Sequence, residues 1–255
     1  MINFVGAGSG AADLITVRGQ RLLCEADVIV YAGSLVNPEL LAVKKPDCEV
    51  HNSACMTLEE VMEVMILAER RGQRVVRLHT GDPCLYGAIK EQMDELERAG
   101  IAYEICPGVS SFCGAAAALK TEYTLPGVSQ SVVITRMAGR TPVPEMESIR
   151  SFAAHQSTMV IFLSTGLLNE LQSELQAGGY PADTPAAIVY KATWPEEKVC
   201  RCTVATLAVT ADREQIRKTA LIVVGETLES EYERSELYNP VFTTEFRQGR
   251  AKENE

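Results

Sequence analysis

The first half of the chain alternates short apolar runs with longer amphipathic stretches. Four such runs end at Gly or Pro turns and are predicted to be buried strands, at residues 2–5, 28–31, 75–79 and 103–106. Between them, apolar residues recur at helical spacing over residues 19–26, 57–71 and 88–99. This alternation predicts an α/β domain over residues 1–118, built on a mostly parallel sheet with helices on both faces.

The pattern changes at residues 119–128, where a Pro-Gly pair predicts a linker. A second α/β domain is predicted over residues 129–245, and residues 246–255 are expected to form a loose tail. The expected strands are 132–135, 159–163, 187–191, 199–204 and 221–224, and the expected helices are 145–154, 167–177 and 212–218. Two of these strands, near 187–204, have no helix between them, so the second sheet is predicted to be mixed.

Composition places the chain among ordinary globular proteins, since 46% of its 255 residues are hydrophobic and 23% are charged. The net charge of −10 argues against nucleic acid or a membrane as the main partner, because phosphate groups are bound by clustered Lys and Arg. No leader or membrane-spanning run is visible, and the eight cysteines form no Cys-x-x-Cys pair. We therefore expect a cytoplasmic protein with free thiols and no protein-bound metal.

Three loops rich in small residues follow three of the predicted strands. Gly6 to Ala11 satisfies G-x-G-x-x-A, a dinucleotide-binding pattern, but the second strand is followed by Ala32 and Gly33 instead of the acid that would hold a ribose. The next loop reads Thr80-Gly81-Asp82-Pro83, and the last reads P-G-V-S-S from Pro107. Because ligands of open α/β sheets bind outside the carboxyl ends of strands, these loops together predict a ligand site.

Taken in order, these segments resemble the tetrapyrrole (corrin/porphyrin) methylase family. The matching motifs are V-G-A-G-x-G, D-V-I-V-Y-A-G-S, T-G-D-P-x-x-Y-G, P-G-V-S-S, G-R-T-P-V-P and Y-K-A-T-W-P, spread over about residues 2 to 245. The last two resemble most the branch of the family that methylates carbon 11 of precorrin-4 or cobalt-precorrin-4. The resemblance implies two α/β domains with a ligand cleft between them, and usually a homodimer.

The resemblance also implies that S-adenosylmethionine is bound and S-adenosylhomocysteine released. Carried over position by position, the cofactor contacts would be Ser9, Thr80, Gly81, Asp82, Leu85, Ser110, Ser111, Leu163, Ala192, Ala220 and Leu221. Two of these depart from the family pattern: Ser9 stands where proline is common, and Leu163 where methionine is frequent. Backbone contacts at these two positions would tolerate the change.

The implied substrate is a tetrapyrrole with many carboxylates, which requires basic side chains despite the net acidity. Candidates are Arg136, Arg140 and Lys191, because Arg binds carboxylates in a bidentate manner and Lys191 adjoins the cofactor segment. No catalytic residue is assigned, since no Ser-His-Asp or Cys-His arrangement is visible and His79 at a strand end reads as structural.

The sequence leaves three classes of function open. The first is a methyltransferase acting at carbon 11 of the corrin precursor in cobalamin biosynthesis, or a sister enzyme acting at another ring position. The second is a nicotinamide-dependent oxidoreductase, which the Gly6–Ala11 pattern favours and the missing acid opposes. The third is a metabolite-binding protein that keeps the fold without turnover.

Overall fold

The computed structural model describes residues 1–33, 35–229 and 231–250. The chain splits into two compact units: Met1–Ala118 with Val189–Lys198, and Leu119–Ile188 with Val199–Glu255. The segment Val189–Lys198, predicted to belong to the second domain, is thus grouped with the first unit. The expected linker 119–128 is grouped with the second. Of the expected tail 246–255, residues 251–255 lie outside the described part of the chain.

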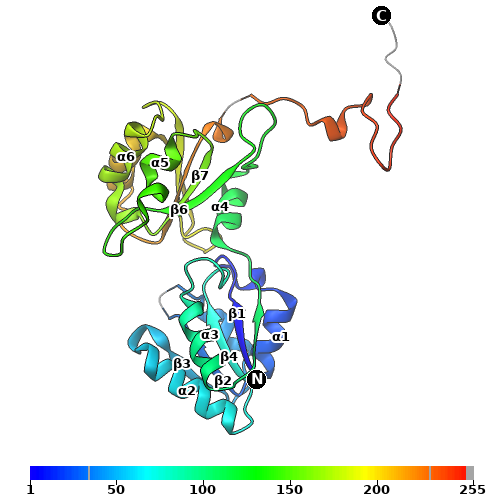
Figure 1. The fold of residues 1–255 in the computed structure, drawn as a ribbon, viewed down its shortest axis with the longest axis vertical. Coiled ribbons are helices and arrows are strands. Elements are labelled where there is room, and N and C mark those ends of the chain that lie inside the picture. The colour runs from blue at the N-terminus through cyan, green and yellow to red at the C-terminus, as the bar shows by residue number, and fades with distance from the viewer. Residues whose placement is uncertain (34, 230, 251–255) are drawn as a thin grey trace, which may run out of the picture. The chain divides into compact units, whose positions relative to one another are not determined.

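The first unit is built on a parallel sheet of five strands in the order β3-β2-β4-β1-β5 (Figure 1). The strands are β1 Ile2–Gly6, β2 Val28–Tyr31, β3 Glu49–Asn52, β4 Val75–His79 and β5 Tyr103–Cys106. The helices are α1 Val17–Glu25, α2 Leu58–Arg70, α3 Ile89–Arg98 and α4 Ser111–Leu119. The chain leaves β1 toward β2 but leaves β4 in the opposite direction, toward β5. The adjacent ends of β1 and β4 are therefore a topological switch point, where open α/β sheets bind ligands.

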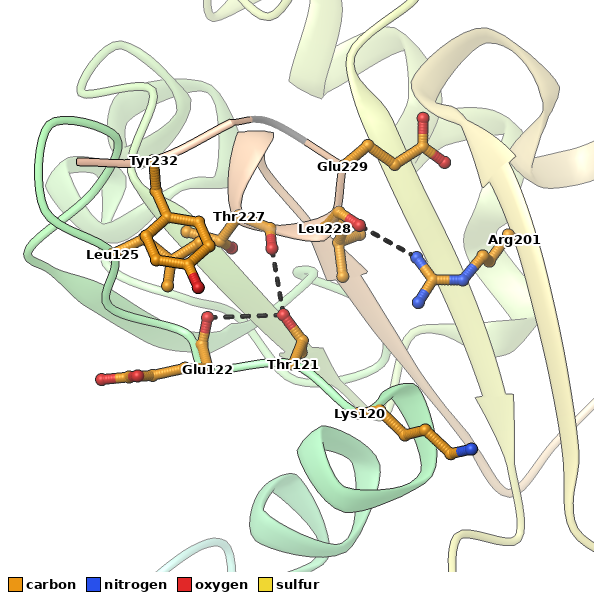
Figure 2. A pocket seen from close by; sticks show the side chains of 9 residues that line it. All are labelled: Lys120, Thr121, Glu122, Leu125, Arg201, Thr227, Leu228, Glu229 and Tyr232. Atoms are coloured by element: carbon orange, nitrogen blue, oxygen red, sulfur yellow. Dashed lines mark hydrogen bonds between the residues drawn. The ribbon is translucent and has the colours of Figure 1, made fainter. Parts of the chain in front are cut away.

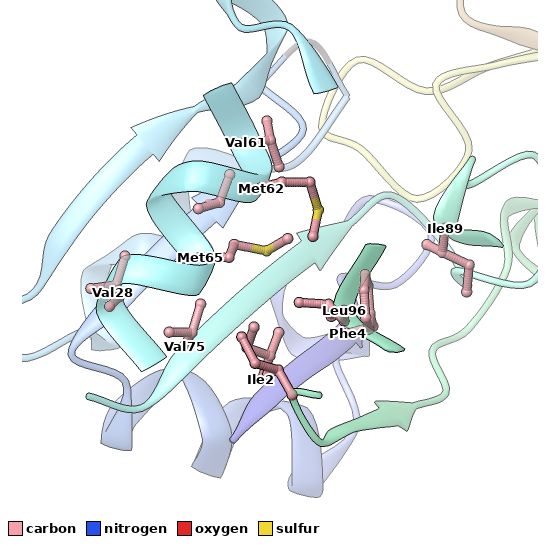
Figure 3. Packing of buried hydrophobic residues seen from close by; sticks show 12 residues of the cluster. Ile2, Phe4, Val28, Val61, Met62, Met65, Val75, Ile89 and Leu96 are labelled. Carbon is pink, nitrogen blue, oxygen red and sulfur yellow. The ribbon is translucent and has the colours of Figure 1, made fainter. Parts of the chain in front are cut away.

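Alternate residues of each strand pack under helices on opposite faces of this sheet. One core cluster joins Ile2, Phe4 and Val75 to Met62 and Met65 of α2 (Figure 3). The other joins Val5, Val76 and Leu78 to Leu23 of α1. Helix α2 begins at a capping box, in which the Thr57 hydroxyl accepts from the N–H of Glu60 and the Glu60 carboxylate accepts from the N–H of Thr57.

The second unit holds a mixed sheet in the order β6-β7-β10-β8-β9. Its strands are β6 Val132–Arg136, β7 Thr158–Phe162, β8 Pro185–Tyr190, β9 Lys198–Thr203 and β10 Ala220–Val224, and its helices are α5 Ile149–Ala153, α6 Leu168–Ala177 and α7 Leu207–Arg213. Strand β7 pairs parallel with β6 and antiparallel with β10, which confirms the predicted mixed sheet. No helix among the described residues is long and apolar enough to span a membrane.

Three sequence expectations need correction. Strand β3 was not predicted, because E-V-H-N at the sheet edge contains a single apolar residue and is half exposed. Helix α7 lies at Leu207–Arg213 and not at residues 212–218, because left-handed backbone at Gln215 and Thr219 interrupts the charged run. Helix 145–154 is divided by Ser148, which ends a 3-10 turn and caps α5 with its hydroxyl.

Candidate functional site

The loops that follow β1, β4 and β5 touch through their backbones. Gly8 and Gly81 exchange two hydrogen bonds, with N···O distances of 3.2 and 3.0 Å. A Cβ on Gly6 would lie 2.6 Å from both the Cα of Gly108 and the carbonyl oxygen of Gly81, so only glycine fits there. Gly81 itself has φ +61°, and its own Cβ would lie 3.5 Å from the Cα of Ser110. The three predicted loops therefore form one surface at the switch point.

Asp82 braces two of these loops. Its Oδ1 accepts from the N–H of Cys84 at 2.8 Å, and its Oδ2 accepts from the N–H of Gly108 at 2.8 Å. Partial burial acts to raise the pKa of Asp82, but the hydrogen bonds from Cys84 and Gly108 outweigh it and hold the pKa below its ordinary value. The carboxylate is thus ionised at neutral pH, and both of its oxygens already have backbone partners.

The segment 190–195 is fastened to the first loop by Thr193. Its hydroxyl lies 3.1 Å from the Ser9 hydroxyl and accepts from the N–H of Ala11 at 3.0 Å. On the same loop, a Cβ on Gly10 would lie 2.2 Å from the Trp194 ring, so the ring rests directly on that glycine. Thr193 and Trp194 therefore place Ala192, a predicted cofactor residue, beside the first loop.

This segment also carries unusual backbone strain. Lys191 and Thr193 have φ of +46° and +67°, a left-handed conformation that is a genuine outlier for a β-branched residue such as Thr193. The Glu197 carboxylate holds the N–H of Thr193 at 2.6 Å, and the Lys191 ammonium lies 5.3 Å from the centre of the Trp194 ring. Strain of this kind persists only where surrounding contacts enforce it, which is frequent at functional sites.

The predicted cofactor residues fall into two groups. Those of the first unit lie on the three loops, on the start of α4 or on the fastened segment: Ser9, Thr80, Gly81, Asp82, Leu85, Ser110, Ser111 and Ala192. Leu163, Ala220 and Leu221 belong to the second unit, where Leu163 follows β7 with φ +53° and is 66% exposed. Ala220 and Leu221, at the start of β10, are buried.

The predicted substrate residues have different surroundings. Arg136 donates to the carbonyl oxygens of Met137, Thr141 and Pro142, at 3.1, 3.2 and 2.8 Å, and so shapes the loop that carries Arg140. Arg140 is exposed on that loop. Lys191 belongs to the first unit and also contacts the Glu196 carboxylate at 3.4 Å.

Two residues of the site were missed by sequence reasoning. Thr193 stood inside a matched motif, but nothing in the sequence signals its left-handed backbone. Asn37 is buried, donates its amide to the carbonyl oxygen of Gly10 at 3.0 Å and accepts from the N–H of Glu39. An Asn-Pro pair just after a strand was the available signal for Asn37.

The second unit contains a separate hollow of about 320 Å³ between the end of α4 and the end of β10 (Figure 2). Arg201 donates to the carbonyl oxygens of Leu228 and Leu119, at 3.0 and 2.9 Å, and the Thr121 hydroxyl donates to that of Thr227 at 3.0 Å. These bonds tie the chain after α4 to the chain after β10. None of the predicted site residues lines this hollow.

The position of Asp27 bears on the dinucleotide hypothesis. It directly precedes β2, at the amino end of the strand, where Lys45 and Arg74 pair with its carboxylate. Its hydrogen bond with Lys45, together with that from Arg74, lowers its pKa. An acid at this end is on the opposite edge of the sheet from the three loops and cannot serve as the ribose ligand of a dinucleotide site.

The family model of Tetrapyrrole (Corrin/Porphyrin) Methylases matches residues 1–208. The chain belongs to this family. The expected resemblance is thereby confirmed, and the fold of two α/β units agrees with that of solved tetrapyrrole methylase structures.

Relatives match this methylase over nearly its whole length. It is 53% identical to a cobalt-precorrin-4 C(11)-methyltransferase of Methanocaldococcus jannaschii, over 97% of this chain and 96% of the relative. It is 46% identical to a precorrin-4 C(11)-methyltransferase of a Sinorhizobium species, over 96% of this chain and 98% of the relative.

Solved structures agree. The X-ray structure of a cobalamin biosynthetic enzyme, cobalt precorrin-4 methyltransferase, superposes with a TM-score of 0.88 at 48% identity, covering 90% of this chain and 96% of that one. A uroporphyrin-III C-methyltransferase of Thermus thermophilus, complexed with S-adenosylhomocysteine, superposes with a TM-score of 0.74 at 27% identity, covering 89% and 93%.

Asp82→Ala should weaken S-adenosylhomocysteine binding about tenfold, because two loops lose their common brace. The affinity of Asp82→Asn, which keeps one acceptor oxygen, should fall between that of this variant and that of the native protein.

Since the pKa of Asp82 is depressed in the folded protein, the brace is complete above about pH 5 and is lost only as the pH falls below about 4. The affinity of the native protein should therefore be level from pH 8 to pH 5. Calorimetric titration with S-adenosylhomocysteine measures the affinities of the two variants and the pH dependence of the native protein. A native-like affinity of Asp82→Ala would refute the brace.

Thr193→Val keeps the shape and the branched Cβ but removes the hydroxyl that holds Ser9 and Ala11. We expect its affinity for S-adenosylhomocysteine to fall about tenfold, while Thr193→Ser, which retains the hydroxyl, stays within about twofold of native. Titration of both variants, with melting temperatures as a check on folding, tests this. Equal affinities for Val and Ser at this position would show that the hydroxyl does not position the site.

Proposed function

We propose that this protein transfers a methyl group from S-adenosylmethionine to carbon 11 of cobalt-precorrin-4, or of metal-free precorrin-4, in cobalamin biosynthesis. The observation that carries the proposal is the 53% identity, over 97% of the chain, to a relative named for that reaction. The glycine-lined loops at the switch point of the first sheet supply a site of the right kind.

The residues present fit S-adenosylmethionine. Close backbone approach at Gly6, Gly81 and Gly108, with the backbone N of Ser111 and the hydroxyl of Ser110 near Gly81, suits an uncharged adenosine moiety held largely by backbone groups. We propose that Ser9, Thr80, Gly81, Asp82, Leu85, Ser110, Ser111, Ala192, Leu163, Ala220 and Leu221 hold it. When bound, this group supplies an electrophilic methyl.

Because that methyl is already reactive, the task of the protein is alignment, which can supply several kcal/mol of the barrier. A protein nucleophile is not required. His79 is 4% exposed, and burial together with the nearby charge of Arg77 lowers its pKa to about 3, so its ring is neutral at physiological pH. We assign it no proton-donating role.

We propose that Arg140 and Lys191 face the carboxylates of the substrate and that Arg136 acts by holding the loop of Arg140. We also propose a cytoplasmic homodimer. Apolar side chains exposed on the last described stretch support a partner of that kind, among them Tyr232 at 64%, Tyr238 at 67% and Phe246 at 93% exposure.

The direct test is incubation of the purified protein with cobalt-precorrin-4, or with precorrin-4, and S-adenosylmethionine carrying a 13C methyl. We expect one label per molecule, found by NMR at carbon 11. Comparison of the rates with the two substrates shows which one the protein prefers. A label at another ring carbon would identify a sister enzyme. Binding of S-adenosylhomocysteine without any transfer would identify a binding protein, and binding of NADH alone would identify an oxidoreductase.

A further inference from the structure

A buried positive charge lies in the first unit, within the strand that leads to the T-G-D-P loop. Arg77 stands in β4 between Val76 and Leu78, and it is 6% exposed. Val76 and Leu78 pack toward α1, so strand alternation directs Arg77 to the opposite face, under α2 and α3. Burial lowers its pKa to about 10, which still leaves the guanidinium charged at neutral pH.

The partners of this guanidinium are neutral. Its Nε donates to Oε1 of Gln92 at 3.0 Å, and one Nη donates to the carbonyl oxygen of Val30 at 3.2 Å. Over residues 1–33, 35–229 and 231–250, no carboxylate forms an ion pair with Arg77. A guanidinium has five N–H donors, and a charge buried without a counter-ion is costly, so the site is electrostatically incomplete.

Arg77 lines a cavity of about 200 Å³ in the same unit. The cavity has an apolar wall formed by Met56, Leu58 and Val61. Gln92, which accepts the hydrogen bond from Arg77, also lines it. Figure 3 shows Val61 on α2, above the sheet. Glu91 also contributes to the lining, but it is exposed and forms no ion pair with Arg77 among the described residues. The volume is below the ~300 Å³ at which pockets for drug-sized ligands begin, so a whole ring does not fit but a short side chain does.

The amino end of α3 adds to the positive field. Gly87 and Ala88 line the cavity, and Ala88 is the N-cap of this ten-residue helix. Its φ is +49°, and no side chain caps the first turn. Among the residues that the structure describes, no side chain accepts from the first N–H groups of α3, and the helix dipole places partial positive charge there.

We propose that this cavity receives one acetate or propionate side chain of the tetrapyrrole substrate, with Arg77 as its counter-ion. The methylenes of such a chain match the apolar wall, and its carboxylate supplies the missing charge and acceptors. This inference rests on the proposed function. It gives an acidic protein a binding point for a polyanion that needs no exposed basic patch.

Two variants test the inference in full-length protein. Gln92→Glu places a carboxylate at the atom that already accepts from Arg77, and so supplies an internal counter-ion that competes with the substrate. Arg77→Gln removes the charge itself. Arg18→Gln, at an exposed position of α1 on the other face of the sheet, is the matched control, since all three variants change the net charge by the same amount.

We expect both test variants to raise the substrate KM about tenfold, with kcat and the Kd of S-adenosylhomocysteine within about twofold of native. Fluorescence titration with uroporphyrin III, a porphyrin with eight carboxylates, should show the same weakening. Arg18→Gln should leave both values near native. This split between KM and kcat is not expected of a merely structural arginine.

Native-like KM and uroporphyrin affinity in Gln92→Glu would overturn the inference. If Arg77→Gln fails to fold, Gln92→Glu alone decides the test. If uroporphyrin III does not bind the native protein, the substrate KM alone decides it. Inorganic phosphate that raises the melting temperature of the native protein but does not compete with uroporphyrin III would also overturn the inference. Such a result would show that the cavity is a site for a free anion. Failure of the native protein to bind S-adenosylhomocysteine would instead refute the proposed function, so the two failures are distinct.

Discussion

Direct backbone contact among three loops is the constraint on which the candidate site depends. Gly6, Gly81 and Gly108 approach so closely that no side chain fits at Gly6 or Gly108, and Asp82 joins the second loop to the third. The parallel sheet brings the loops to one edge, because β1 lies between β4 and β5. The strained Thr193 segment is then fastened onto the first loop. Loss of this contact would separate residues that the proposed cofactor must meet together.

Charge is arranged locally in this acidic protein. The net charge is −10, yet the proposed substrate is a polyanion. Arg77 reconciles the two, because a single buried guanidinium in a low-dielectric site interacts with a carboxylate more strongly than several solvated side chains do. Arg136 illustrates the opposite case, since three carbonyl oxygens of its own loop already occupy its guanidinium.

The buried strands and the glycine loops could be predicted from the sequence because continuous apolar runs that end in glycine or proline have few alternative structures. Strand β3 could not be predicted because an edge strand needs no apolar run. Helix α7 was placed too far along the chain because its apolar face is short and the charged residues after it have a helix-like pattern. Thr193 and Arg77 could not be foreseen as positioned groups. A left-handed threonine, and a buried arginine that pairs with no carboxylate in the described part of the chain, are consequences of tertiary packing, which no local pattern encodes.

Hydrogen exchange with and without saturating S-adenosylhomocysteine reports both whether this nucleoside binds to the three loops and where. We predict slowed exchange in peptides covering residues 6–11, 80–87, 107–113 and 190–195, the loops joined by the contacts of Gly81, Asp82 and Thr193. Unchanged exchange in all four peptides, or protection confined to other parts of the chain, would contradict it.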